Sequence, residues 1–324
     1  YFIISAMKAK NKLLTLLILS ATTAASIAAI NKIIKFTAVS KNLLNDDKSK
    51  SLCFKWRLGN VHYTKAGSGM PLLLIHDLNS ASSGYEWSRI VSSLQNDYTV
   101  YTIDLLGCGR SEKANMTYTN YLYVQLISDF IKSEIGHRTS VIATGESASI
   151  PIMACANNPE LFDQLMFINP LSVQDFCQMP GKASKMYKFV VELPMIGTLL
   201  YNIANSRQAI HERFVESGFQ NPYSVKSSYV DAYYESAHLG GSPKSMYASI
   251  SCNYTRCNIV NALRKIDNSM YLIGGNGIEH IEDRLNEYKE YNSAIETALI
   301  PGTKGLPQLE APEELVELIR TYIH

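Results

Sequence analysis

The sequence predicts an α/β protein with a mostly parallel, doubly wound sheet and helices on both faces. The first observation is a set of short, continuous apolar runs such as Leu72–Ile75, which are typical of strands buried on both faces. The second is that these runs alternate with amphipathic stretches such as Tyr121–Ile135, whose apolar side chains recur at helical spacing. Strand and helix in alternation favour a parallel sheet between helical layers.

The elements follow in order from residue 54. Gly59-Asn60 lies between Phe54–Leu58 and Val61–Lys65, which predicts an antiparallel hairpin. Six strands are expected after it, at Leu72–Ile75, Thr99–Ile103, Val141–Thr144, Leu165–Ile168, Met270–Ile273 and Ile295–Ile300. Helices are expected at Tyr85–Leu94, at Tyr121–Ile135, after Val141–Thr144, and at Pro312–Ile323. This domain is therefore expected to cover residues 54–324.

Residues 171–255 interrupt the alternation. They are rich in Tyr and Phe, they break at Pro194, Pro222 and Pro243, and they contain no convincing strand. We expect an inserted helical cap here, over the carboxyl ends of the strands, where open α/β sheets bind ligands.

Composition and charge restrict the classes of partner. The formal net charge is +1, which disfavours a nucleic-acid partner. The six cysteines are scattered without metal-ligand spacing, so neither a metal nor another cofactor is expected. Buried free thiols are predicted at Cys108 and Cys155, and a disulfide between Cys252 and Cys257 is left open.

Residues 1–35 form a basic and hydrophobic N-terminal region. Three lysines precede the uncharged run 13–30, which is close to the shortest stretch that can span a bilayer. We expect an uncleaved signal anchor that places the main domain outside the cytoplasm. The alternative is a cleaved signal peptide and a secreted protein. Residues 36–53 are polar and are expected to be a linker.

A candidate nucleophile lies in Gly145-Glu146-Ser147-Ala148-Ser149. This segment follows the strand at Val141–Thr144 and precedes an apolar helix. Strand, sharp turn with a central Ser, and helix form the context of a nucleophile elbow, in which the strained turn needs small residues on both sides. Gly145 and Ser149 meet that need.

Four stretches in the same order and spacing resemble the α/β-hydrolase family, in its lineage with a helical cap. They are Leu73–His76, Asp104–Ser111, Gly145–Ser149 and Gly302–Glu314. The resemblance implies Ser147 as nucleophile and the backbone N–H groups of Ala148 and Leu78 as oxyanion donors. Asp77 is unfavourable there, because its carboxylate follows His76 beside the place where negative charge must develop.

The same resemblance implies that the catalytic base and acid are lost. Gly305 stands at the His position, and Ile278 stands at the acid position, with Asn169 at the alternative acid site. His280, on a loop at the correct sheet edge, and His238, in the cap, are the candidate substitute bases.

Two hypotheses follow. The first is a membrane-anchored serine ester hydrolase with a degraded triad, acting through Ser147. The second is a catalytically inactive homologue that binds a small apolar ligand or a partner protein. Loss of the base removes about six orders of magnitude of turnover in serine hydrolases, so family membership does not decide between them.

Overall fold

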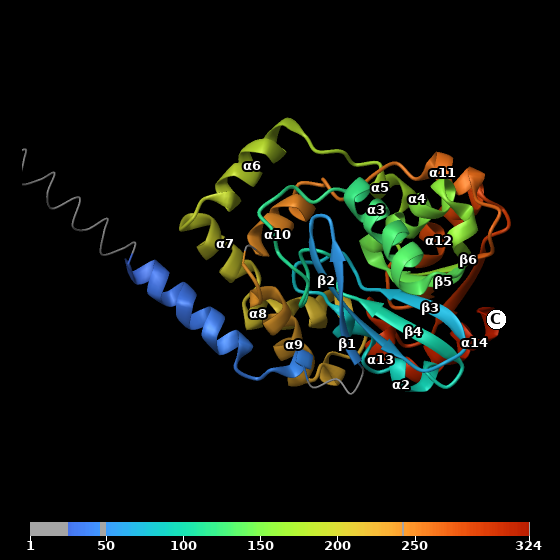
Figure 1. Cartoon of the computed structure of the whole chain (residues 1–324), viewed down its shortest axis with the longest axis horizontal. Coiled ribbons are helices and arrows are strands. Elements are labelled where there is room, and N and C mark those ends of the chain that lie inside the picture. The colour runs from blue at the N-terminus through green and yellow to red at the C-terminus, as the bar shows by residue number, and fades with distance from the viewer. Residues whose placement is uncertain (1–24, 46–49, 242, 324) are drawn as a thin grey trace, which may run out of the picture.

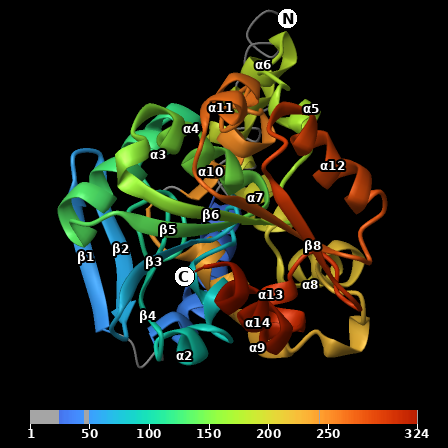
Figure 2. The same cartoon turned by 90° about the vertical axis from the view of Figure 1, so that its right-hand side faces the viewer.

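The computed structural model describes residues 25–45, 50–241 and 243–323. Their centre is an eight-stranded sheet in the order β1-β2-β4-β3-β5-β6-β7-β8 (Figures 1 and 2). The strands are β1 (Lys50–Trp56), β2 (Gly59–Ala66), β3 (Met70–Ile75), β4 (Tyr98–Ile103), β5 (Thr139–Thr144), β6 (Phe162–Ile168), β7 (Met270–Gly275) and β8 (Glu296–Ile300). β1 and β2 form the predicted hairpin and are antiparallel, and the sheet from β4 to β8 is parallel. The predicted fold class is confirmed.

Helices cover both faces of the sheet. One face packs against α3 (Asn120–Phe130), α4 (Ser149–Asn157), α11 (Val260–Lys265) and α12 (Ile281–Tyr291) through a large apolar core. The other face packs against α2 (Val91–Leu94) and α14 (Pro312–Tyr322) through a second core. Strands such as β5 are buried along their whole length, which explains their continuous apolar sequence.

One expected helix is broken. In place of a helix at Tyr85–Leu94, the chain forms a short 3₁₀ turn, η2 (Gly84–Trp87), and then α2. The Ser83 hydroxyl caps η2, and Gly84 N–H donates to the Asp104 carboxylate at 2.6 Å, which binds the turn to the end of β4. By contrast, the expected helix at Tyr121–Ile135 forms as α3 and a wider π-helical turn, η3 (Ile131–Ile135), closed by left-handed Gly136.

The segment between β6 and β7 is helical in its described residues. Before α11 it holds α5 (Val173–Phe176), α6 (Lys182–Glu192), α7 (Ile196–Ala204), α8 (Arg207–Arg213), η6 (Phe214–Gly218), η7 (Pro222–Ser224), α9 (Ser227–His238) and α10 (Pro243–Ser251). We call the part from α6 to α10 the cap. Cys252 and Cys257 are free thiols, so no disulfide joins them, and Cys108 and Cys155 are buried and free as predicted.

The N-terminal helix, residues 25–39, packs on the cap. Its Lys35 donates to Gly240 O at 2.7 Å, and Asn31 accepts from Asn202 at 2.6 Å. The predicted linker 36–53 includes the end of this helix, the turn η1 (Leu43–Asn45) and the first residues of β1, so the sheet begins before residue 54. Most of the predicted membrane segment 13–30 lies outside the described residues. Among the described residues, no helix has the length and apolarity needed to cross a membrane.

Candidate active site

The turn after β5 holds a left-handed residue at Gly145, not at Ser147. Gly145 has a φ of +55° and is followed by the tight turn η4 (Gly145–Ala148) and by α4. Ser147 is 0% exposed, and its hydroxyl donates to Thr144 O at 2.7 Å. A nucleophile elbow places the strained conformation at the nucleophile itself, and here that position is Gly145.

The carboxylate of Asp77 fills the place beside Gly145. Asp77 Oδ1 accepts the Glu146 N–H at 2.8 Å, and the Leu78 N–H also bonds this carboxylate. A Cβ atom on Gly145 would overlap Asp77 Oδ1. In this fold the oxyanion donors are the N–H after the nucleophile and an N–H from the loop after β3. Glu146 and Leu78 supply those two N–H groups, so the Asp77 carboxylate occupies the oxyanion position.

Glu86 forms a second buried carboxyl group next to Asp77. It accepts from the Thr144 hydroxyl at 2.6 Å, from Gln308 Nε2 at 2.7 Å and from the Asp77 N–H at 3.3 Å. Burial raises the pKa of Glu86 to about 8, and the nearby Asp77 carboxylate adds to the shift. Burial likewise raises the pKa of Asp77 to about 7. The pair therefore holds protons near neutral pH, when ordinary carboxyl groups are ionised.

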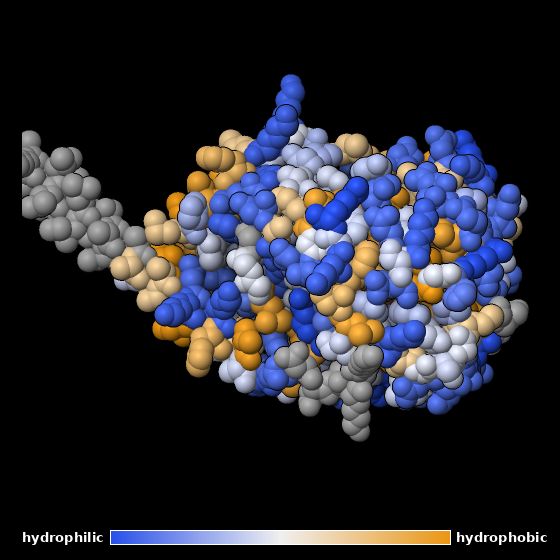
Figure 3. Space-filling view, in the orientation of Figure 1, coloured by the Kyte–Doolittle hydropathy of each residue, from blue (hydrophilic) through white to orange (hydrophobic). Residues whose placement is uncertain are grey.

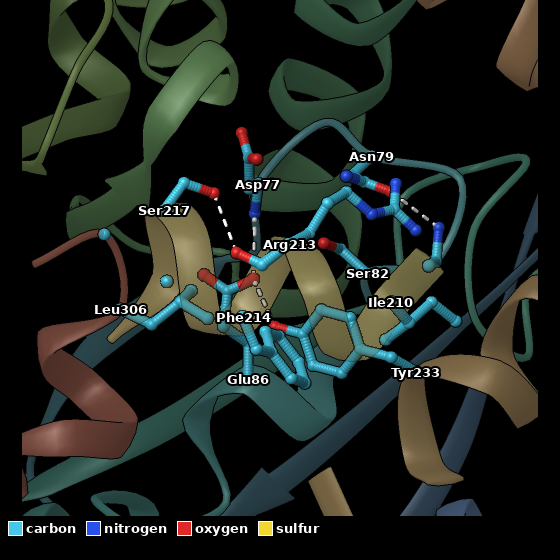
Figure 4. A pocket seen from close by; sticks show the side chains of 13 residues that line it. Asp77, Asn79, Ser82, Glu86, Ile210, Arg213, Phe214, Ser217, Tyr233 and Leu306 are labelled. Carbon is cyan, nitrogen blue, oxygen red and sulfur yellow. Dashed lines mark hydrogen bonds between the residues drawn. The ribbon is translucent and has the colours of Figure 1, made fainter. Parts of the chain in front are cut away.

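These carboxyl groups line two cavities that share the Gly305 loop. The first has a volume of about 180 Å³ and lies between the loop after β3 and the cap (Figure 4). It is lined by Asp77, Asn79, Ala81, Ser82, Glu86, Ile210, Arg213, Phe214, Ser217, Gly218, Tyr233, Gly305 and Leu306. The second, about 310 Å³, extends along the strand ends past Gly145, Asn169 and Ile278. Neither lining includes Ser147 or Ala148, whereas Leu78 lines the second cavity.

Arg213 places a cation at the first cavity, which we call the Asp77 cavity. Its Nη2 atom is buried and has no hydrogen-bond partner among the described residues. Figure 4 shows its side chain passing Asn79 and Ser82 at the cavity wall. Ile210 and Phe214 add apolar surface from the same helical stretch of the cap. This combination of one unpaired cation and apolar walls suits a small molecule with an oxygen acceptor.

Backbone groups of the cap fill the space beside Gly305. Gly305 N–H donates to Ser217 O at 3.1 Å, and a Cβ atom on Gly305 would overlap that same carbonyl oxygen. Asn169 donates to the carbonyl oxygens of Lys304 and Gly305 and accepts the Gly275 N–H. Ile278 lines the second cavity as an apolar residue. The positions that the resemblance assigned to a lost base and a lost acid therefore carry structural contacts instead.

The two substitute histidines lie away from the Asp77 cavity. His280 begins α12 with an exposed side chain and pairs with Asp283 at 3.2 Å. His238 ends α9 and lines a different cavity, against the N-terminal helix. His76 fixes the loop: its Nδ1 lies 2.7 Å from Asp77 O, and its Nε2 accepts the Leu105 N–H at 3.0 Å. For Ser147, a role as nucleophile stays a prediction: the residue is buried, its hydroxyl donates to Thr144 O, and it lines neither of the two cavities.

Sequence reasoning identified Asp77 as unfavourable for an oxyanion, and the structure confirms that this side chain faces the site. It missed Gly145, Glu86 and Arg213. Two registers fit the pattern of small residues on both sides of the nucleophile. Gly145-x-Ser147-x-Ser149 places Ser147 at the centre, whereas Ala143-x-Gly145-x-Ser147 places Gly145 there. The first register made Gly145 only the small residue before the nucleophile. Glu86 and Arg213 carry no local motif, and only the packing of the cap on the loop after β3 brings them together.

Comparison with known proteins decides the family. The model of the α/β hydrolase family matches residues 72–318. The chain belongs to the α/β-hydrolase family. Similar curated proteins include a soluble epoxide hydrolase of Corynebacterium sp. (strain C12), 29% identical over 110 residues, which are 34% of this chain and 37% of that protein. Another is the 2-hydroxy-6-oxo-6-(2'-aminophenyl)hexa-2,4-dienoic acid hydrolase of Metapseudomonas resinovorans, 27% identical over 110 residues, which are 33% of this chain and 38% of that protein.

These sequence matches span little more than a third of each relative's length. Solved α/β-hydrolase structures match far more of the chain. The epoxide hydrolase CorEH superposes with a TM-score of 0.69 at 18% identity, over 85% of this chain and 98% of that one. A serine hydrolase involved in carbazole degradation gives 0.67 at 14% identity, over 85% and 98%. At such identities the likeness concerns the fold alone.

Proposed function

We propose that this α/β-hydrolase family member binds a small molecule in the Asp77 cavity and does not hydrolyse esters through a serine. The observation that carries the proposal is the Asp77 carboxylate, which accepts the Glu146 N–H beside Gly145. A tetrahedral intermediate needs those N–H groups for its own negative oxygen. Here they already bind a carboxylate, and Gly145, which takes the position of the nucleophile, has no side chain.

The ligand class follows from the lining of the cavity. Arg213 offers a buried N–H without a partner among the described residues, and Phe214 and Ile210 offer apolar surface. A buried donor without a partner costs about 1–3 kcal/mol, which a ligand oxygen would recover. A small molecule with an apolar body and a carboxylate or carbonyl oxygen fits both features.

Ester turnover tests the catalytic half of the proposal. Wild type and Ser147→Ala should both release p-nitrophenol from p-nitrophenyl butyrate at the rate of the buffer alone. The comparison includes Ser149→Ala, a matched control in which the neighbouring buried serine is removed. Turnover by the wild type that disappears only in Ser147→Ala would establish the serine ester hydrolase instead.

Ligand binding tests the other half, with benzoate as the probe. Saturation-transfer NMR should detect benzoate bound to the wild type, and Arg213→Met should abolish the signal while keeping a side chain of similar length. Arg57→Met, at the exposed end of the β1–β2 hairpin, is the control and should bind like the wild type. Equal binding by the Arg213 variant would refute this assignment of the ligand site.

We also propose that residues 13–30 anchor the protein in a membrane and that the main domain lies outside the cytoplasm. The support is the uncharged run between flanking lysines in the sequence. Carbonate extraction of membranes should leave the full-length protein in the pellet. Protease added to intact cells should remove the domain. Full-length protein in the soluble fraction contradicts the anchor.

A further inference from the structure

A separate cavity of about 330 Å³ lies between the N-terminal helix and the cap. It is lined by Asn31, Lys32, Lys35, Thr198, Tyr201, Asn202, His238, Gly240, Gly241, Pro243 and Lys244. We call it the helix–cap cavity. It shares no lining residue with the Asp77 cavity, so it is an independent site.

His238 carries an unpaired nitrogen at this cavity. The side chain belongs to a residue that is only 5% exposed, and its Nδ1–H donates to Tyr234 O at 2.8 Å. Its Nε2 atom is buried and has no hydrogen-bond partner among the described residues. The ring is held between Tyr201 and Tyr234, so it cannot turn freely to find one. A ligand atom in the cavity is the natural partner for Nε2.

The charged groups around the cavity are cations. Lys32, Lys35 and Lys244 line it, and no Asp or Glu is found among the described residues of its lining. Lys35 and Lys244 donate to backbone carbonyl oxygens of Gly240, Glu192 and Leu193, which fixes their ammonium groups at the wall. Behind Gly240 lies the buried Lys113 side chain, which adds further positive charge. Three cations without a lining anion attract a negatively charged ligand.

Apolar side chains continue outward from the cavity on the same two helices. On the N-terminal helix, Ile30 and Ile33 are exposed, and on α7, Ile196, Leu200 and Ile203 are exposed. Figure 3 shows orange side chains gathered at this end of the molecule, over the N-terminal helix and the cap. An apolar surface next to a cationic cavity suits a ligand with an anionic head and a hydrocarbon tail.

We propose that the helix–cap cavity binds the phosphate-bearing headgroup of an anionic membrane lipid. Lys32 contacts the phosphate, His238 Nε2 accepts a hydrogen bond from a hydroxyl group of the headgroup, and the acyl chain lies along the exposed apolar side chains of α7. A lipid is favoured over a free phosphate ion because Tyr201 and Pro243 give the cavity apolar walls, and because apolar surface continues beyond it. Lipid binding would also hold the N-terminal helix against the cap.

Native mass spectrometry of the full chain in a neutral detergent tests the proposal. Titration with dioleoyl phosphatidylglycerol should give one saturable lipid, whereas dioleoyl phosphatidylcholine should bind at least tenfold more weakly. Lys32→Gln and His238→Phe should each weaken phosphatidylglycerol binding about tenfold. Lys132→Gln, an exposed lysine on η3, is the control and should bind like the wild type.

Three outcomes would overturn the proposal. One is equal affinity of Lys32→Gln and wild type, since this exposed side chain can be replaced without disturbing the fold. Another is equal binding of the two lipids. The third is displacement of the lipid by inorganic phosphate at equimolar concentration, which would assign the site to a free anion. The melting temperature of each variant without lipid shows whether a loss of binding reflects a loss of folding.

Discussion

Replacing Glu86 with Gln should change how the stability of the protein depends on pH. The folded protein raises the pKa of Glu86 from 4.5 to about 8, chiefly through burial. Between about pH 4.5 and pH 8, Glu86 holds a proton in the folded state that it has released in the unfolded state. Stability linked to this group is therefore fully present below about pH 4.5 and is lost as the pH rises through about 8.

The magnitude follows from one proton. A proton bound only by the folded state changes the free energy of unfolding by about 1.4 kcal/mol per pH unit. Glu86→Gln removes this group. The average slope is somewhat smaller than this limit, because unfolded Glu86 is still partly protonated near pH 5 and folded Glu86 is about half ionised near pH 8. The stability of the wild type minus that of Glu86→Gln should fall by about 1 kcal/mol per pH unit between pH 5 and pH 8.

Urea denaturation at several pH values measures this difference. Burial lowers the pKa of His76 and of His238, so these two groups make stability increase with pH. Both proteins contain them, so their contribution cancels in the difference between wild type and variant. Glu314→Gln, at an exposed glutamate on α14, is the matched control and should run parallel to the wild type. Parallel curves for wild type and Glu86→Gln would refute the reasoning, since Glu86 would then be ionised in the folded protein.

Three further substitutions test the packing of the site. Gly145→Ala should lower the free energy of unfolding in urea by about 2 kcal/mol, because a Cβ at this left-handed residue overlaps Asp77. Adding Asp77→Gly should restore part of that loss. If the effects of the two substitutions on the free energy of unfolding simply add, the contact is refuted. Gly305→His should lower the melting temperature and give no esterase activity, because its Cβ overlaps Ser217 O; a stable, active variant would contradict this. Asn169→Ala should cost about 2–3 kcal/mol, since it leaves three backbone groups unpaired, and a loss under 0.5 kcal/mol would contradict their importance.

The sheet could be predicted from the sequence because its signals are local. Continuous apolar runs such as Leu72–Ile75 mark strands buried on both faces, and Gly59-Asn60 marks the hairpin. The broken helix near Tyr85 could not be predicted, because its cause is a bond from Gly84 to Asp104, in a different part of the chain. Long-range polar contacts of this kind leave no periodic pattern in the sequence.

The site was predicted less well, for two physical reasons. Small residues alternate through Ala143, Gly145, Ser147 and Ser149, so the pattern alone does not say which residue takes the strained turn. The backbone φ of Gly145 and the hydrogen bond from Glu146 to Asp77 settle it, and neither is visible in the sequence. The depth of Glu86 and the approach of Arg213 depend on how the cap packs, which no local rule predicts.

Labelling with a fluorophosphonate probe, read by intact-protein mass spectrometry, tests the central claim most directly. The claim is that Gly145, and not a reactive serine, stands at the nucleophile position, and that the Asp77 carboxylate fills the oxyanion position beside it. We predict that the folded wild type gains no phosphonyl mass at a probe concentration that labels an active serine esterase completely in the same tube. Stoichiometric labelling that Ser147→Ala abolishes would contradict the account and would identify Ser147 as a working nucleophile.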